Sequence, residues 1–329
     1  MSTVIILGAG GVFANHFARH CLEMGFRKVI AVGRNPRLSS CFTLGVGVDD
    51  DRYEYHQIHI VFEQRRLLEL FDKEKPEFVF NYAALAYANS WDDSDLFYNT
   101  NCISVVQMVA HLKSNDYIKR FVQIGTSEMY GPTSSKPAKE YDIPNPTSPY
   151  AVSKLATDMH LNTLFNVEDF PMNIVRPSNC YGTGQYVYRI IPKAILYFLF
   201  DKPFPLEGGG LAEKSFMYVD DLNKALELIL DKGTIGDTYN VGPDAPISMH
   251  DIVLEICRQM DKDPNEFIEF RPGRVGEDRK YWIDSQKIKR ELGWKPEVSF
   301  EQGISKMIDW VKEYQHDLAS SPDQFILRA

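Results

Sequence analysis

A tyrosine and a lysine stand four residues apart in the run Tyr150-Ala151-Val152-Ser153-Lys154. On a helix, residues i and i+4 lie on one face, so the phenol and the ammonium can meet in one site. A neighbouring cation favours the phenolate and lowers the pKa of a tyrosine from about 10 toward the working range. We therefore expect Tyr150 to act as an acid–base group, with Lys154 keeping it acidic.

A second candidate group lies upstream, where the apolar run Phe121–Ile124 ends in Gly125-Thr126-Ser127-Glu128. The pattern predicts a buried strand followed by a turn, and open parallel sheets keep their active sites at the carboxyl ends of their strands. A carboxylate at the end of a buried strand needs a partner or a function, because burying an unpaired charge is costly. Thr126, Ser127 and Glu128 are therefore candidate catalytic residues.

The chain opens with a phosphate-binding pattern, Gly8-Ala9-Gly10-Gly11-Val12-Phe13-Ala14, directly after the apolar run Val4–Leu7. Gly8 permits a tight turn, and Gly11 lets the backbone approach a pyrophosphate that faces the N-terminus of the following helix. The next predicted strand ends in Gly33-Arg34, without the acid that holds the ribose of NAD. An arginine can clamp a 2′-phosphate, so we expect NADP, with NAD as the alternative.

Alternating strands and helices must position these groups. Strands are expected at Val4–Leu7, Val29–Val32, Phe78–Phe80, Phe121–Ile124, Asn173–Val175 and Tyr239–Val241. Helices are expected over Val12–Met24, around Leu67–Phe71 and Val105–Leu112, after an N-cap at Asp220, and near 251–260, 285–292 and 300–313. The pattern predicts an α/β fold, a Rossmann-type doubly wound parallel sheet with a smaller, interleaved C-terminal domain. We expect residues 1–178 and 216–243 in the sheet domain, and 179–215 and 244–329 in the second domain.

Composition excludes several classes of protein. The 329 residues are 44% hydrophobic and 25% charged, as in globular proteins. The net charge of −9 excludes a protein that coats nucleic acid non-specifically. The five cysteines form no metal-binding spacing and indicate free thiols in a reducing cytosol. Neither a signal peptide nor a membrane span is expected, because the apolar run at 194–200 is far shorter than about 20 residues. We expect a cytoplasmic protein with no metal site.

An ordered set of motifs carries a family resemblance. Besides the runs above it includes Asn81-Tyr82-Ala83-Ala84, Asn101, Arg176-Pro177-Ser178-Asn179-Cys180-Tyr181-Gly182, Tyr239-Asn240-Val241-Gly242, and Glu291-Leu292-Gly293-Trp294-Lys295-Pro296. The chain resembles the extended short-chain dehydrogenase/reductases that act on nucleotide sugars. It is most similar to the nucleotide-sugar 4,6-dehydratases of the GDP-mannose and dTDP-glucose types.

Three positions depart from the family pattern. Ala14 stands at the third glycine, and His59 replaces the acid that usually contacts the adenine. Ser127 stands where the dTDP-glucose enzymes have an aspartate that protonates the leaving hydroxyl. Thr-Ser-Glu looks more like GDP-mannose 4,6-dehydratases and UDP-glucuronate decarboxylases. Either Glu128 then performs both proton transfers, or Ser127 or a water relays one of them.

The resemblance implies a hydro-lyase reaction on a nucleotide-diphosphate hexose. Tyr150 would take the C4 hydroxyl proton during oxidation by the nicotinamide, with Thr126 on the reacting oxygen and Lys154 on the ribose. Glu128 would remove the C5 proton, water would leave from C6, and hydride would return to C6. The implied cofactor-binding residues are Gly8, Gly11, Val12, Phe13, Arg34, His59, Ile60, Ala83, Ala84, Asn101, Gly125, Tyr150, Lys154 and Pro177. The implied substrate-binding residues are Tyr87, Asn179, Arg189, Ile190, Lys193, Lys214, Asn240 and Arg279.

Other outcomes on the same scaffold stay open: a 4-epimerase, a 4-keto reductase, a decarboxylase, or a non-catalytic NADP sensor. An epimerase needs no C5 base, and the intact Thr126, Tyr150 and Lys154 argue against a sensor. The family commonly forms homodimers through two helices. Apolar residues there either pair with a second copy or belong to the core: Tyr98, Val105, Val106, Val109, Leu155, Met159 and Leu164.

Overall fold

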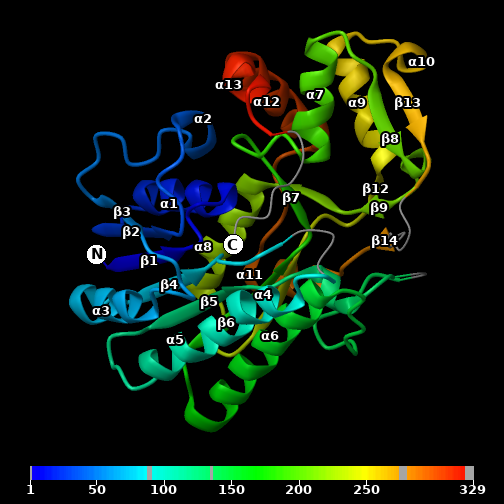
Figure 1. Cartoon of the computed structure of the whole chain (residues 1–329). Helices are drawn as coiled ribbons and strands as arrows, with labels where there is room; N and C mark the ends of the chain where they lie inside the picture. Colours follow the sequence, from blue (N-terminus) through cyan, green and yellow to red (C-terminus); the bar gives the residue numbers. More distant parts are fainter. Residues whose placement is uncertain (1, 87–90, 134–135, 274–279, 323–329) are drawn as a thin grey trace.

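A seven-stranded parallel sheet forms the centre of the protein (Figure 1). The computed structural model describes residues 2–86, 91–133, 136–273 and 280–322. The strand order is β11-β6-β5-β4-β1-β2-β3, and every neighbouring pair is parallel. The strands are β1 (Thr3–Leu7), β2 (Lys28–Gly33), β3 (Tyr53–Gln57), β4 (Phe78–Asn81), β5 (Arg120–Ile124), β6 (Met172–Pro177) and β11 (Thr238–Val241).

Helices cover both faces of this sheet, as the continuous apolar strands predict. Val4 and Ile6 of β1 lie in one core with α1 (Val12–Glu23), α8 (Val219–Lys232) and α11 (Gln286–Leu292). Ile5 and Leu7, which point to the other face, lie in a second core with α3 (Gln64–Glu74), α5 (Ser104–Leu112) and α6 (Pro149–Glu168). Figure 1 shows α3, α5 and α6 below the sheet and α1 above it. This is the Rossmann-type arrangement that the sequence predicts.

The smaller C-terminal part has a core of its own. Its helices are α7 (Ile190–Leu199), α9 (Met249–Met260), α10 (Pro264–Phe267), α12 (Phe300–Glu313) and α13 (Gln315–Ala319). Short strands pair among themselves: β7 (Asn179–Tyr181) with β10 (Phe216–Tyr218), β8 (Phe204–Glu207) with β13 (Ile268–Arg271), and β9 (Glu213–Lys214) with β12 (Ile247–Ser248) and β14 (Lys280–Tyr281). The remaining elements are α2 (Ser40–Thr43), α4 (Ser94–Tyr98), the π-helix η1 (Asn99–Ile103), and the 3₁₀-helices η2 (Ser127–Tyr130) and η3 (Gly208–Gly210).

The two parts are interleaved along the chain. After the second part begins at β7, α8 and β11 return to the sheet, where β11 pairs with β6. The helix α11 also packs in the sheet core, through Ile288 and Leu292, although it follows residue 244. The division into two domains stays a prediction, and this packing favours assigning α11 to the sheet domain.

Two local expectations differ from the structure. The helix α8 begins at Val219, so Asp220 lies in its first turn and is not the N-cap. The neighbouring Asp221 carboxylate instead accepts hydrogen bonds from the backbone N–H groups of Glu297 at 2.7 Å and Val298 at 3.3 Å. The edge strand β3 was not expected, because its sequence Tyr-Glu-Tyr-His-Gln is half polar and only its first residue is buried.

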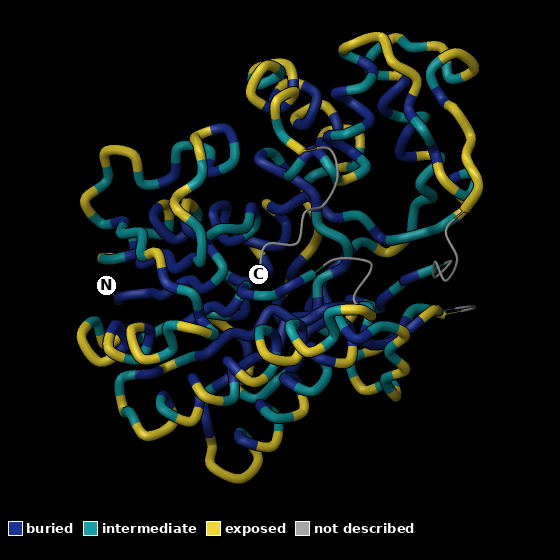
Figure 2. Tube along the Cα trace, in the orientation of Figure 1, coloured by how far each residue is buried: buried dark blue, intermediate teal, exposed yellow. Residues whose placement is uncertain are grey.

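Burial follows the same layers. Figure 2 shows the buried trace running through the sheet and the exposed residues on the outer helices and loops. Within the described residues, the structure has no helix with the length and apolar character that a bilayer crossing requires. All five cysteines are free, and Cys21, Cys41 and Cys257 are buried.

Candidate active site

The turn after β5 carries three of the expected catalytic residues. Thr126 is the N-cap of η2, and its hydroxyl oxygen accepts the Glu128 backbone N–H at 3.2 Å. Thr126 and Ser127 are buried, whereas Glu128 is half-buried. This cap turns the chain sharply at the carboxyl end of a central strand, which presents the Glu128 side chain at the sheet edge.

The start of α6 brings Tyr150 to the same place. Ser148 caps this helix by accepting the Ala151 backbone N–H at 3.2 Å, and Pro149 occupies the first turn, where its missing N–H costs nothing. The Tyr150 hydroxyl forms a hydrogen bond with the Thr126 side chain. Burial, and then the negative charge of Glu128, raise the pKa of Tyr150. The structure therefore brings Thr126, Glu128 and Tyr150 together.

Lys154 lies one helical turn further along and is 2% exposed. Its ammonium donates to the carbonyl oxygen of Ile124 at 2.6 Å, and burial lowers its pKa to about 8. The expected lowering of the Tyr150 pKa is not seen. The pKa of the phenol is raised, because burial and the Glu128 carboxylate outweigh the hydrogen bond from Thr126 and the charge of Arg189.

The glycine-rich turn has the shape of a phosphate cradle. Gly8 has a φ of +85°, and a Cβ atom there would lie 2.6 Å from the backbone nitrogen of Ala83. Gly11 precedes α1 without a side-chain cap, and a Cβ atom on Gly10 would meet no atom within 4 Å. The first N–H groups of α1 therefore have no side-chain cap, which suits the pyrophosphate of a dinucleotide. Val12 and Phe13 begin that helix.

The ends of β2 and β3 lie beside this cradle. A Cβ atom on Gly33 would lie 2.8 Å from the Gly10 nitrogen and would also collide with the Tyr55 hydroxyl, so an acidic side chain has no room there. Arg34 is half-buried. Burial, and then the charge of Arg34, lower the pKa of His59. The two residues therefore face the same region.

His59 holds a buried nitrogen that suits a ligand. Its Nδ1 accepts the Val61 backbone N–H at 3.2 Å, so the neutral ring carries its proton on Nε2. Nε2 is buried and has no hydrogen-bond partner among the described residues. Together with the uncapped helix terminus, this orphaned donor fits a bound dinucleotide.

Two residues expected to contact ligands, Asn101 and Asn240, use their side chains in hydrogen bonds within the protein. The Asn101 side chain binds both backbone polar atoms of Leu85, at 2.8 and 3.0 Å, and donates to the Ser153 hydroxyl at 3.0 Å. The Asn240 amide accepts from the Tyr130 hydroxyl at 2.9 Å and donates to the Ala138 carbonyl at 3.1 Å. Both side chains are 0% exposed, so they brace the site from behind.

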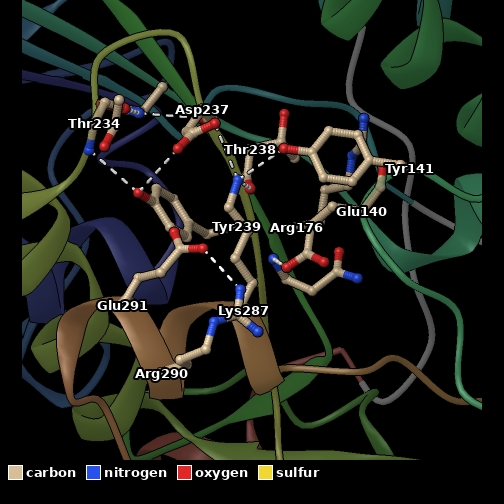
Figure 3. A network of polar contacts seen from close by, with 12 residues as sticks. Glu140, Tyr141, Arg176, Thr234, Asp237, Thr238, Tyr239, Lys287, Arg290 and Glu291 are labelled. Carbon is tan, nitrogen blue, oxygen red and sulfur yellow. Dashed lines mark hydrogen bonds and ion pairs between the residues drawn. The ribbon is translucent and has the colours of Figure 1, made fainter.

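A wider polar network supports the loop around Glu140 (Figure 3). The Glu140 carboxylate accepts the backbone N–H of Asn240 at 2.9 Å. The Lys287 ammonium from α11 donates to the Tyr141 hydroxyl and the Thr238 carbonyl, each at 3.0 Å, and pairs with Asp237 at 3.0 Å. This loop is thus tied to both β11 and α11.

The remaining predicted residues come from several elements of both parts of the chain. Arg189 precedes α7, and its charge lowers the pKa of Tyr150, so the guanidinium is within electrostatic reach of the phenol. Ile190 and Lys193 are on α7, Asn179 begins β7, and Lys214 ends β9. Ile60 and Ala83 are buried, Ala84 and Pro177 are half-buried, and Gly125 follows β5. Tyr87 and Arg279 lie outside the described residues.

Three buried residues of the site were not among the predicted site residues. Asp158 is four residues after Lys154, and its carboxylate pairs with Arg176 at 2.9 Å; Arg176 also donates to the Tyr130 hydroxyl at 2.7 Å. The i+4 spacing from Lys154 is a signal that could have identified Asp158. Among the described residues, no group of three or more His, Cys, Asp or Glu side chains could hold a metal ion.

Comparisons with known proteins agree with this geometry. A trifunctional UDP-glucose 4,6-dehydratase/3,5-epimerase/reductase from Arabidopsis thaliana is 29% identical over 93% of this chain and 46% of its own length, so the chain spans about half of that relative. A dTDP-glucose 4,6-dehydratase from Shigella flexneri is 29% identical over 93% of this chain and 92% of that one.

Solved structures show the same likeness. A dTDP-glucose 4,6-dehydratase from Bacillus anthracis in complex with NAD superposes with a TM-score of 0.87 at 27% identity, covering 96% of this chain and 98% of that one. Nucleotide-sugar epimerases also occur among the structural neighbours, at identities that establish the fold alone. The model of the family described as GDP-mannose 4,6 dehydratase matches residues 5–307. By this match over most of its length, the chain belongs to the GDP-mannose 4,6 dehydratase family.

Proposed function

We propose that this chain is a nucleotide-sugar 4,6-dehydratase, which removes water across C5 and C6 of a nucleotide-diphosphate hexose and yields a 4-keto-6-deoxy product. One observation carries the proposal: the Glu128 carboxylate lies close enough to Tyr150 for its charge to raise the pKa of the phenol. A reaction confined to C4 needs the phenol but no second base. The elimination needs both groups in one site.

The chain's residues divide the proton transfers. Tyr150 takes the proton of the C4 hydroxyl, while Thr126 hydrogen-bonds the same oxygen and Lys154 binds the nicotinamide ribose. Once C4 is a ketone, the C5 proton is acidic and Glu128 removes it. The C6 hydroxyl leaves as water, with its proton supplied by Glu128 or relayed by Ser127. When hydride has returned to C6, C5 takes up a proton from solvent and Tyr150 releases the C4 proton to solvent. Each positioned acid or base contributes about 10²–10⁴-fold in rate.

Bound NAD(P) supplies the reversible two-electron acceptor for C4 and donor for C6, so no net oxidation occurs. Gly8, Gly11 and the N-terminus of α1 would hold its pyrophosphate. We propose NADP as the preferred form, because Arg34 and the Nε2–H of His59 are donors that suit a phosphate and Gly33 leaves no acid to repel one. The Bacillus anthracis relative is a complex with NAD, so a direct comparison of the two cofactors is required.

The nucleotide half of the substrate would lie against the second part of the chain. The proposed contacts are Tyr87, Asn179, Arg189, Ile190, Lys193, Lys214 and Arg279, whose four cations suit a diphosphate. Asn240 would support this pocket indirectly, through its bond to Tyr130.

A sugar-acid decarboxylase is the second candidate. Such an enzyme must hold a substrate carboxylate, and Arg189 brings a cation within electrostatic reach of Tyr150. Incubation with UDP-, dTDP-, GDP- and CDP-hexoses and with a UDP-hexuronate, followed by mass spectrometry, separates the two. Loss of water from a hexose supports the dehydratase, and loss of carbon dioxide from the hexuronate supports the decarboxylase. A change of configuration without a change of mass identifies an epimerase.

We also propose a homodimer that pairs through α6 and the α4–η1 segment. Val105, Val109 and Leu164, which were candidates for such an interface, are instead buried in the sheet core. Exposed apolar side chains remain on these elements: Tyr98, Ile103, Val152 and Met159, the last of which is 61% exposed. Light scattering should give about twice the chain mass of 37.7 kDa, and Met159→Glu should halve it.

The free cysteine thiols are relevant to the cellular compartment of the protein. All five cysteines lack disulfide partners, and three are buried. We propose a reducing cytosol as the compartment, which localisation of a tagged chain would test.

A further inference from the structure

We propose that Asp158 is a positioning residue that keeps the Lys154 ammonium charged beside Tyr150, and that Arg176 keeps the Asp158 carboxylate ionised. The proposal rests on the catalytic roles proposed above for Tyr150 and Lys154. It adds a buried ion pair, Asp158–Arg176, that supports them.

One face of α6 carries the three helical side chains of this arrangement. Tyr150, Lys154 and Asp158 follow one another at four-residue spacing, so they form a stripe along the helix. Lys154 is 2% exposed and Asp158 is 1% exposed. An aspartate is a poor choice for the buried side of a helix unless its charge is used, because burying a lone carboxylate is costly.

Arg176 on β6 is the partner that keeps Asp158 charged. Its Nε donates to Asp158 Oδ2 at 2.9 Å, and its Nη1 donates to the Tyr130 hydroxyl at 2.7 Å and to the Glu140 carbonyl at 3.0 Å. Figure 3 shows Arg176 beside Glu140. Because a guanidinium does not lose its proton in proteins, it is a fixed positive charge against the carboxylate.

The pair lies directly under the catalytic turn. A Cβ atom on Gly125 would lie 3.2 Å from Arg176 Cγ and 3.4 Å from Asp158 Oδ2. The second carboxylate oxygen, Oδ1, is buried and has no hydrogen-bond partner among the described residues. Arg176 therefore uses one oxygen of Asp158, and the charge of the carboxylate acts through space on the Lys154 ammonium one turn away.

The titratable and charged groups around this face come from three elements and from the residue before α7. Tyr150 and Asp158 are on α6 itself, Glu128 and Tyr130 are on η2, Arg176 is on β6, and Arg189 precedes α7. Burial lowers the pKa of Lys154 to about 8, and the charge of Asp158 opposes that decrease. Burial raises the pKa of Asp158, while Arg176 and then Lys154 oppose that increase. Removing the carboxylate would leave only about half of Lys154 protonated at pH 7.

The test measures Lys154 directly in the cofactor-free protein. Lysines labelled with ¹³C at Cε are titrated by NMR, and the Lys154 signal is assigned with Lys154→Arg. We expect a midpoint near pH 8 in the wild type. In Asp158→Asn the midpoint should fall by about one pH unit, the effect of losing a close opposite charge. Asp158→Glu, which restores the carboxylate, should return the midpoint toward its wild-type value.

A matched control separates charge from burial. Asp221 is another buried carboxylate, on α8, where it accepts two backbone N–H bonds away from the site. Asp221→Asn should leave the Lys154 midpoint unchanged. A folded Asp158→Asn variant with a wild-type Lys154 midpoint would overturn the proposal. If that variant does not fold, ¹³Cγ labelling of the wild-type aspartates decides, because a protonated Asp158 over the range in which Lys154 titrates also overturns it.

The pH dependence of kcat/KM provides a second test. A protonated Lys154 is lost as the pH rises through its pKa, so the alkaline limb of kcat/KM should move to lower pH in Asp158→Asn. A midpoint moved from about 8 to about 7 lowers the protonated fraction at pH 8, and hence kcat/KM, about fivefold. Loss of activity by the same factor at every pH would indicate a structural role only. Failure of the wild type to turn over any nucleotide sugar would contradict the proposed function and leave the NMR result intact.

Discussion

Replacing Glu128 with glutamine separates elimination from redox chemistry at C4. Glutamine keeps the shape and hydrogen-bonding capacity of the side chain but cannot accept a proton. The backbone cap from Thr126 to residue 128 does not involve this side chain, so the turn should persist. If Glu128 is the C5 base, the elimination should slow by about 10²–10⁴-fold, which corresponds to roughly 3–5 kcal/mol of barrier.

The first half-reaction should survive in Glu128→Gln. The charge of Glu128 raises the pKa of Tyr150, so its removal makes the phenol a better acid and oxidation of C4 is not impaired. Single-turnover absorbance should therefore show reduced nicotinamide accumulating with a 4-keto-hexose, and solvent deuterium should no longer enter C5.

Two variants of the same turn serve as controls. Glu128→Asp keeps a carboxylate at a shifted position and should be less impaired than Glu128→Gln. Ser127→Ala tests the relay to the leaving hydroxyl while Glu128 stays in place. A Glu128→Gln enzyme that forms the 4-keto-6-deoxy product at a near-normal rate would refute the reasoning and would favour an epimerase or a reductase.

Three further outcomes are expected. Tyr150→Phe should abolish turnover while circular dichroism and cofactor affinity stay nearly unchanged; activity within tenfold of wild type would remove the phenol from the mechanism. Arg34→Ala should weaken NADP selectively, by about tenfold or more in calorimetry, whereas an equal loss for both cofactors or a native preference for NAD would contradict the assignment. Gly8→Ala should destabilise the protein in urea by more than the ~1–2 kcal/mol of a positive φ, because its Cβ atom would meet the Ala83 nitrogen at 2.6 Å; Gly45→Ala, with φ +67° and open space, isolates the φ contribution.

Local sequence patterns predicted the structure of this chain where a single physical requirement limits the residue types. The strands from Val4–Leu7 to Tyr239–Val241 were predictable because strands buried on both faces are continuous apolar runs between helical patterns. The glycine turn was predictable because a positive φ and a close backbone approach leave few other residue types. The half-polar edge strand β3 carries no such requirement and was missed.

The sequence by itself therefore determined the fold class and the glycine-rich turn, and it predicted Thr126, Glu128, Tyr150 and Lys154 as one catalytic set. Only the tertiary structure decided how their charges act on one another. Spacing on α6 suggested that Lys154 would acidify Tyr150, yet burial and the Glu128 carboxylate from another element raise the pKa of the phenol. The Asp158–Arg176 pair joins α6 to β6 across 18 residues of sequence. Burial and through-space charge depend on what packs nearby in three dimensions, and residue order does not specify those neighbours.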